Sequence, residues 1–136
     1  MASHINLSPP RVEAVKEALA GKRVLLVEDS GFLCFALEQT LREAGCEIVG
    51  PCSRLEEAMN EASHHELDCA LLDINLRGEM VSPLAAHLRE RGVPFVLTSA
   101  YSEHELPADL IGEPQIRKPF TDKQVLESLA SVLARH

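Results

Sequence analysis

The sequence has few basic residues for its acidic ones, and it has no long apolar run. Thirteen Lys and Arg residues stand against 21 Asp and Glu residues, which gives a formal net charge of −8. A nucleic-acid backbone would be repelled unless basic residues gathered in a patch, and no such patch is visible. No stretch approaches the ~18 apolar residues that span a bilayer, and the N-terminus MASHINLSPP has no signal-peptide pattern. We therefore expect a cytoplasmic protein that binds neither nucleic acid nor membrane.

Cysteine spacing typical of a metal site or a thiol redox motif is also missing. The chain has four cysteines, Cys34, Cys46, Cys52 and Cys69. None belongs to a C-x-x-C pair, so we expect small, reduced core residues and not zinc ligands. His64 and His65 are adjacent at the expected end of a helix, where neighbouring side chains diverge and would not share a metal.

The chain is long enough for one domain. Its 136 residues are 46% hydrophobic, which allows one ordinary core and leaves little room for a second. We expect a domain over residues 22–136 and an N-terminal extension over residues 1–21 that carries one helix. In that extension Val12, Val15 and Leu19 recur at helical spacing after two prolines. We expect this narrow apolar stripe to pack on the chain's own domain, with pairing to a second subunit or a mobile helix as alternatives.

Short apolar runs alternate with helical patterns from Val24 onward, which is typical of βα units. The expected strands are VLLV (24–27), EIVG (47–50), CALL (69–72), PFVL (94–97) and QIR (115–117). Five parallel strands with helices on both faces form an α/β, flavodoxin-like (βα)5 doubly wound sheet with strand order 2-1-3-4-5. The sequence therefore predicts this fold with one extra N-terminal helix.

Local signals mark where the helices begin and end. Gly45 follows a helical pattern, as glycine often does just past a helix end. Two capping boxes are expected, Ser53 with Glu56 and Thr121 with Gln124. The connection YSEHELPADLIGEP, residues 101–114, is different, because its two prolines and one glycine leave room for a short helix at most.

Polar residues follow the expected strands at the points where these end. The first strand is followed by Glu28 and Asp29, the third by Asp73, the fourth by Thr98 and Ser99, and the fifth by Lys118. Each has an ordinary explanation alone, such as Asp29 capping the next helix. Together they would converge, because the carboxyl ends of parallel strands meet at one edge of the sheet. Three close carboxylates repel one another unless protons or a cation neutralise them, and Mg²⁺ suits such oxygen ligands.

This convergence predicts a reaction as well as a metal site. Asp73 could act as a carboxylate nucleophile toward phosphorus and form an acyl phosphate. Mg²⁺ and Lys118 would neutralise the charge on the phosphoryl group, and the Ser99 hydroxyl could donate a hydrogen bond to one of its oxygens. The paired acids Glu28 and Asp29 would then hold the metal.

Four motifs resemble the receiver domains of two-component response regulators: VLLVEDS, ALLDINLRGE, PFVLTSAY and RKPF. The resemblance covers about residues 22–134. It implies that Asp73 is the phosphoacceptor, Ser99 the switch hydroxyl and Lys118 the lysine that pairs with the phosphate. It also implies a Mg²⁺ ion held by Glu28, Asp29, Asp73 and the backbone carbonyl of Asn75.

PFVLTSAY and DINLRGE are also similar to the stand-alone FATGUY-type receivers, which implies a sensor histidine kinase of the HWE or a related class as partner. The chain departs from the Phe-Ala-Thr-Gly pattern of that group at Leu97, Thr98, Ser99 and Ala100. Many receivers carry Tyr or Phe where Gln115 stands, so Tyr101 is a candidate for the switch or for a shield of the acyl phosphate. We expect phosphorylation to order residues 101–112 instead of rotating a preformed aromatic ring.

These features predict a single-domain response regulator that accepts a phosphoryl group on Asp73 from a histidine kinase or a phosphotransfer protein. The chain ends at His136, soon after the last expected helix. We therefore expect output through contact with a downstream regulator or through phosphate relay, from a monomer or a weak homodimer. We do not expect an enzyme in the usual sense.

Three other functions remain open. A degenerate receiver could bind partners without phosphate, although the full set of acids, hydroxyl and lysine argues against it. A Mg²⁺-dependent phosphatase of the haloacid-dehalogenase type would place a D-x-D motif after the first strand, where this chain has adjacent Glu28 and Asp29. A flavodoxin-like FMN carrier would need a first loop rich in Ser, Thr and Gly, and the two acids would repel its phosphate.

Overall fold

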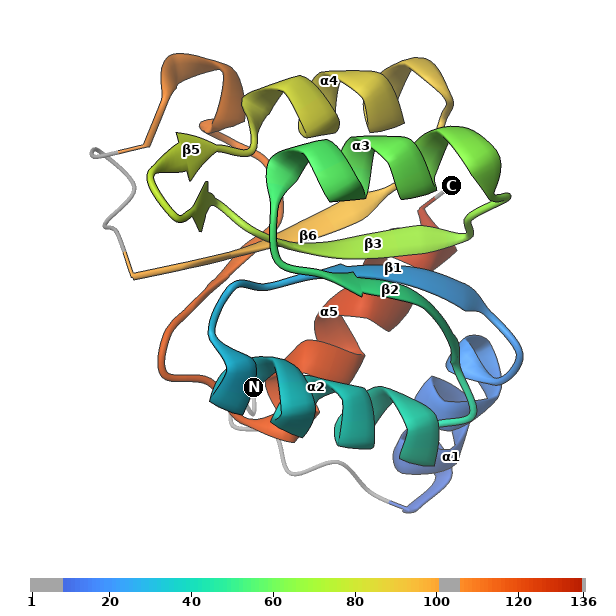
Figure 1. The fold of residues 1–136 in the computed structure, drawn as a ribbon. Coiled ribbons are helices and arrows are strands. Elements are labelled where there is room, and N and C mark those ends of the chain that lie inside the picture. Colours follow the sequence, from blue (N-terminus) through green and yellow to red (C-terminus); the bar gives the residue numbers. More distant parts are fainter. Residues whose placement is uncertain (1–8, 101–105, 136) are drawn as a thin grey trace.

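The main sheet has five parallel strands in the doubly wound order. The computed structural model describes residues 9–100 and 106–135. The strands are β1 (Arg23–Val27), β2 (Glu47–Cys52), β3 (Cys69–Asp73), β6 (Phe95–Ser99) and β7 (Gln115–Arg117). They lie in the order β2-β1-β3-β6-β7 (Figure 1). The predicted flavodoxin-like fold with order 2-1-3-4-5 is confirmed, because β6 and β7 are the fourth and fifth strands of this sheet.

Helices cover both faces of the sheet (Figure 1). One face carries α3 (Leu55–His64) and α4 (Ser82–Glu90), and the other carries α1 (Pro9–Leu19), α2 (Gly31–Glu43) and α5 (Asp122–Ala134). The connection between β6 and β7 contains one 3₁₀ turn, η2 (Ala108–Leu110), in its described part. None of the helices in residues 9–100 and 106–135 is long and apolar enough to cross a membrane.

The core is divided by the sheet into two apolar clusters. Alternate residues of one strand point to opposite faces, so Leu72 packs toward α3 and α4 while Leu71 packs toward α2 and α5. Every residue of β3 and β6 is buried, as expected for central strands covered on both sides. All four cysteines are free thiols, and Cys69 is fully buried in the second cluster.

A small hairpin that the sequence reading missed follows β3. Strands β4 (Asn75–Leu76) and β5 (Glu79–Met80) pair antiparallel, with two residues each. Their turn needs positive φ at both central positions, 53° at Arg77 and 89° at Gly78. The Asn75 side chain accepts a hydrogen bond from the Gly78 amide at 2.8 Å. The hairpin begins two residues after Asp73, so it lies next to the end of β3.

One predicted capping box forms and the other does not. At α5 the Gln124 amide donates to Oγ1 of Thr121 at 3.1 Å, and the Thr121 amide donates to Oε1 of Gln124 at 2.8 Å. The box of Ser53 with Glu56 was wrong: Arg54 occupies the N-cap of α3 without a side-chain cap. The amide of Ser53 donates instead to Oε1 of Glu57 at 3.1 Å, because the helix begins one residue later than the box requires.

The N-terminal helix packs on the domain, as we expected for its apolar stripe. α1 contacts α5, and Leu19 at its end is fully buried in the cluster under α2 and α5. Val15 is partly buried against the same cluster. The division into an extension over 1–21 and a domain over 22–136 stays a prediction.

Candidate metal and phosphorylation site

Three carboxylates gather at the carboxyl edge of the sheet. Glu28 and Asp29 follow β1, and Asp73 ends the neighbouring strand β3. One ligand oxygen from each of the three lies within 4.8 Å of the others. The adjacent strand ends therefore bring together the acids that the sequence reading assigned to a metal.

The local backbone holds the first two acids in place. The Ser30 amide donates to Oε2 of Glu28 at 3.0 Å, and the Ser30 hydroxyl caps α2 by accepting from the Leu33 amide. Ser30 is thus the helix cap, which leaves Asp29 available for other contacts. Oδ2 of Asp29 accepts from the Arg77 amide at 2.8 Å, so the β4–β5 hairpin is tied to the site.

Lys118 supplies the positive charge of the site. Its Nζ donates to Oδ2 of Asp73 at 3.1 Å and lies 3.4 Å from Oε1 of Glu28. Its amide donates to the carbonyl of Ser99 at 2.8 Å, which fixes the backbone after β7 beside the end of β6. The Lys118–Pro119 peptide bond is cis. Lys118 therefore lies beside Asp73, and its predicted pairing with a phosphate stays a prediction.

Burial disfavours the ionised forms of Glu28 and Asp73. Burial, with the negative charge of Asp73 adding to it, raises the pKa of Glu28 to about 7. Burial also raises the pKa of Asp73, against the opposing effect of Lys118. Burial lowers the pKa of Lys118, but the charges of Asp73 and Glu28 outweigh this effect and raise it overall. If all three acids were ionised, the single positive charge of Lys118 would not balance their negative charge.

These residues fit a divalent metal such as Mg²⁺. Oε1 of Glu28 is buried and has no hydrogen-bond partner within the described residues. Three carboxylates face one ammonium group, and hard oxygen ligands are those that Mg²⁺ prefers. This oxygen has only the long contact of 3.4 Å with Nζ of Lys118, so a second cation beside it would be favourable.

The remaining predicted residues lie at or near the same edge. Ser99 ends β6 and is 1% exposed. Asn75 begins β4, and its amide donates to Oδ1 of Asp73 at 3.3 Å, while the role of its carbonyl as a ligand stays a prediction. Tyr101 lies outside the described residues. The sequence reading gave no role to Thr98, which is buried in register with Asp73.

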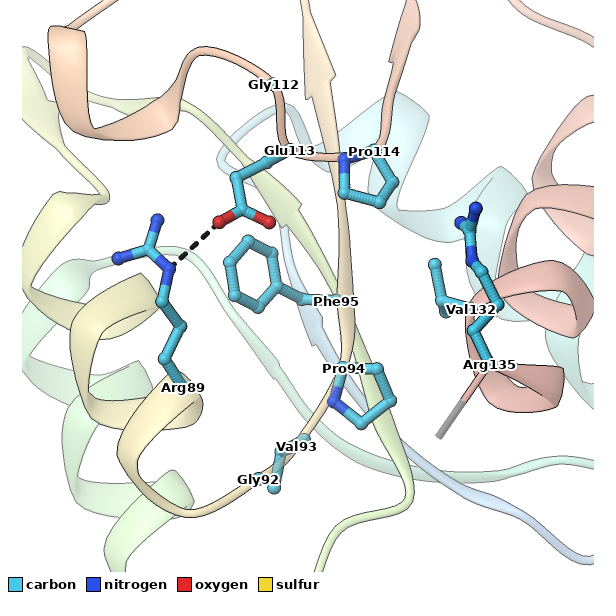
Figure 2. A pocket seen from close by; sticks show the side chains of 10 residues that line it. All are labelled: Arg89, Gly92, Val93, Pro94, Phe95, Gly112, Glu113, Pro114, Val132 and Arg135. Atoms are coloured by element: carbon cyan, nitrogen blue, oxygen red, sulfur yellow. Dashed lines mark hydrogen bonds and ion pairs between the residues drawn. The ribbon is translucent and has the colours of Figure 1, made fainter.

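A separate cavity of about 380 Å³ lies at the opposite end of β6 (Figure 2). In Figure 2, Pro94 and Phe95 lie between Arg89 of α4 and Arg135, which directly follows α5. The Arg89 guanidinium lies over the Phe95 ring and binds Glu113 at 2.9 Å. This ion pair ties α4 to the loop before β7, and none of the site residues lines the cavity.

The fold and this site define a class of protein. It is a doubly wound α/β domain with a buried aspartate, two further acids and a lysine at the carboxyl edge of the sheet. The family model described as the response regulator receiver domain matches residues 24–130. The chain therefore belongs to the response regulator receiver family, and the resemblance seen in its motifs is confirmed.

Known proteins similar to this chain include short receivers and longer regulators. The solution structure of SdrG from Sphingomonas melonis Fr1 has 30% identity and a TM-score of 0.72, and covers 85% of this chain and 98% of its own. Chemotaxis protein CheY of Thermotoga maritima is 26% identical over 118 residues, covering 82% of this chain and 98% of its own length. Transcriptional regulatory protein PdtaR of Mycobacterium tuberculosis is 27% identical over 123 residues, 88% of this chain. The match spans 60% of PdtaR.

Proposed function

We propose that this chain is a response regulator that accepts a phosphoryl group on Asp73 from a histidine kinase or a phosphotransfer protein. The observation that carries the proposal is the buried carboxylate of Asp73 with Nζ of Lys118 at 3.1 Å, beside two further acids. Glu28, Asp29, Asp73 and the Asn75 carbonyl would hold Mg²⁺.

The reaction moves a phosphoryl group from nitrogen to oxygen. A carboxylate oxygen of Asp73 forms the new bond to phosphorus as the bond to the donor's histidine nitrogen breaks, and that nitrogen keeps the electron pair. Bound Mg²⁺ supplies neutralisation of the phosphoryl charge. Lys118 favours the ionised form of Asp73 against the effect of burial and pairs with a phosphoryl oxygen, while Ser99 donates to another.

Exposed aromatic rings beside the site support a protein donor. Phe32 and Phe35 lie in the first turns of α2, which begins shortly after Asp29, and they are 88% and 62% exposed. Aromatic side chains are enriched at protein interfaces and costly to leave in water. A donor that reaches Asp73 would cover them. The HWE kinase class, the FATGUY subgroup and a downstream regulator stay predictions.

Intact mass after incubation with acetyl phosphate tests the proposal. We expect one added phosphoryl group on the wild type with Mg²⁺, and none without Mg²⁺ or on Asp73→Asn. No adduct, under conditions that label a known receiver, would favour a partner-binding domain that takes no phosphate. A beryllofluoride titration then separates that result from fast hydrolysis, because a receiver with short-lived phosphate would still bind the analogue.

A further inference from the structure

Thr98 has a buried hydroxyl that none of the roles above uses. The residue is 1% exposed, and its Oγ1 has no hydrogen-bond partner in the described part of the chain. A buried hydroxyl without a partner destabilises the fold, and valine has nearly the same shape without that cost. The hydroxyl therefore needs an explanation other than packing.

The strand register places Thr98 beside the acceptor aspartate. Thr98 of β6 and Asp73 of β3 are paired. Val96 and Leu71, two residues earlier on the same strands, both belong to the cluster under α2 and α5. Because side chains alternate along a strand, Thr98 and Asp73 lie on that same face of the sheet, whereas Ser99 alternates to the other.

Lys118 has to cross β6 to reach Asp73. β6 lies between β3 and β7, and neighbouring strands are about 4.8 Å apart, so about 10 Å separate β3 from β7. Ile116 of β7 is paired with Thr98 and packs in the cluster under α2 and α5. By the same alternation, Lys118 starts on this face, and its side chain passes over the part of β6 that carries Thr98.

We infer that Thr98 is a positioning residue whose Oγ1 accepts a hydrogen bond from Nζ of Lys118 when this ammonium group turns away from Glu28. In the present geometry Nζ has one hydrogen bond, to Asp73, and a longer contact of 3.4 Å with Glu28. An ammonium group has three protons to donate. A cation bound by the acids would take over Glu28, and Thr98 is a buried acceptor on the face of β6 that the lysine crosses. The inference rests on the proposed function.

The two states make opposite demands on this hydroxyl. In the resting protein it is an unpaired polar group, so its removal stabilises the fold. During phosphoryl transfer it holds Lys118 over the Asp73 carboxylate, so its removal slows the reaction. A purely structural threonine would show neither the gain in stability nor the separate loss of rate.

Thr98→Val and Thr98→Ser, compared with the wild type, test the inference through two measurements. One is the urea midpoint of the metal-free protein, and the other is the rate of labelling by acetyl phosphate with Mg²⁺. We expect Thr98→Val to unfold at a higher urea concentration and to be labelled about threefold to tenfold more slowly. Thr98→Ser keeps the hydroxyl and should be labelled within about twofold of the wild-type rate. Thr40→Val is the matched control, because the Thr40 hydroxyl donates to the Ala36 carbonyl, and its loss should lower the midpoint.

Three outcomes would overturn the role of Thr98. They are a lower urea midpoint for Thr98→Val, a labelling rate of that variant equal to the wild-type rate, and failure of Thr98→Ser to restore the rate. A wild type that takes no label contradicts the proposed function itself, and the role of Thr98 with it. That result is distinct from a labelled wild type with an equally reactive valine variant, which contradicts this inference alone.

Discussion

At the scale of single residues, Glu28 is an acid whose ionised form is disfavoured by burial. It is 2% exposed, its Oε1 has no hydrogen-bond partner among the described residues, and its pKa is raised to about 7. The position of the acids at the strand ends was predictable, because parallel strands end at one edge of the sheet. The degree of burial of Glu28 was not predictable, since it depends on how the rest of the chain packs around the strand end.

Glu28→Gln should therefore change how the metal-free protein responds to pH. The Glu28 carboxyl titrates at about 7 in the folded protein and near 4.5 in the unfolded chain, so the unfolded chain loses this proton first. Wild-type stability should fall as pH rises from 4.5 to about 7, by about 1 to 3 kcal/mol relative to Glu28→Gln. Urea unfolding across this pH range measures the difference. Glu17→Gln, at an exposed position, is the control. If the wild type and Glu28→Gln showed the same change of stability with pH, the raised pKa of Glu28 would be contradicted.

At the scale of helices and strands, the exact residue at which each helix begins decided whether a predicted capping box formed. The Thr121 box formed because its two residues sit at N-cap and N3 of α5. The Ser53 box failed because α3 begins after Arg54, and a one-residue shift is beyond what the pattern resolves. The β4–β5 hairpin could not be read from periodicity, since strands of two residues are too short to alternate.

The capping box of α5 should have a measurable effect on stability. Thr121→Ala removes the acceptor of the Gln124 amide and should lower the free energy of unfolding by about 1 kcal/mol. Urea unfolding with an unchanged dependence on denaturant would measure it. Ser131→Ala, at an exposed position on the same helix, should stay within about 0.5 kcal/mol of the wild type. Equal effects of the two changes would contradict a role for the cap.

The exposed start of α2 should matter for a protein donor and not for a small one. Phe32→Ser and Phe35→Ser should each slow transfer from a purified histidine kinase that phosphorylates the wild type, by about tenfold if the ring is central to the contact. Labelling by acetyl phosphate should be unchanged, because a small donor does not need the two rings as a docking surface. Glu43→Ser, exposed at the far end of α2, is the control. If the rates with the kinase and with acetyl phosphate fell equally, the substitutions would act on the phosphorylation site itself and not on the docking of the kinase.

At the scale of the whole molecule, the residues that form the apolar core and the residues of the charged site occupy different parts of the sheet. The two apolar clusters fill both faces, while the charged groups of the site meet at one edge. The strand order and the site followed from the alternation of strands and helices and from the polar residue at each strand end. The path of Lys118 across β6 did not follow, because it depends on strand register, which a single sequence leaves open.

The position of the phosphoryl group is the most direct test of the central claim. Borohydride reduces an acyl phosphate and converts the acceptor aspartate to homoserine, so peptide mass spectrometry after labelling identifies the residue. We expect homoserine at position 73 alone, and only after labelling with Mg²⁺ present. Homoserine at position 29, at any other aspartate, or equally with and without Mg²⁺ would contradict the claim that Asp73 is the acceptor of this metal-dependent site.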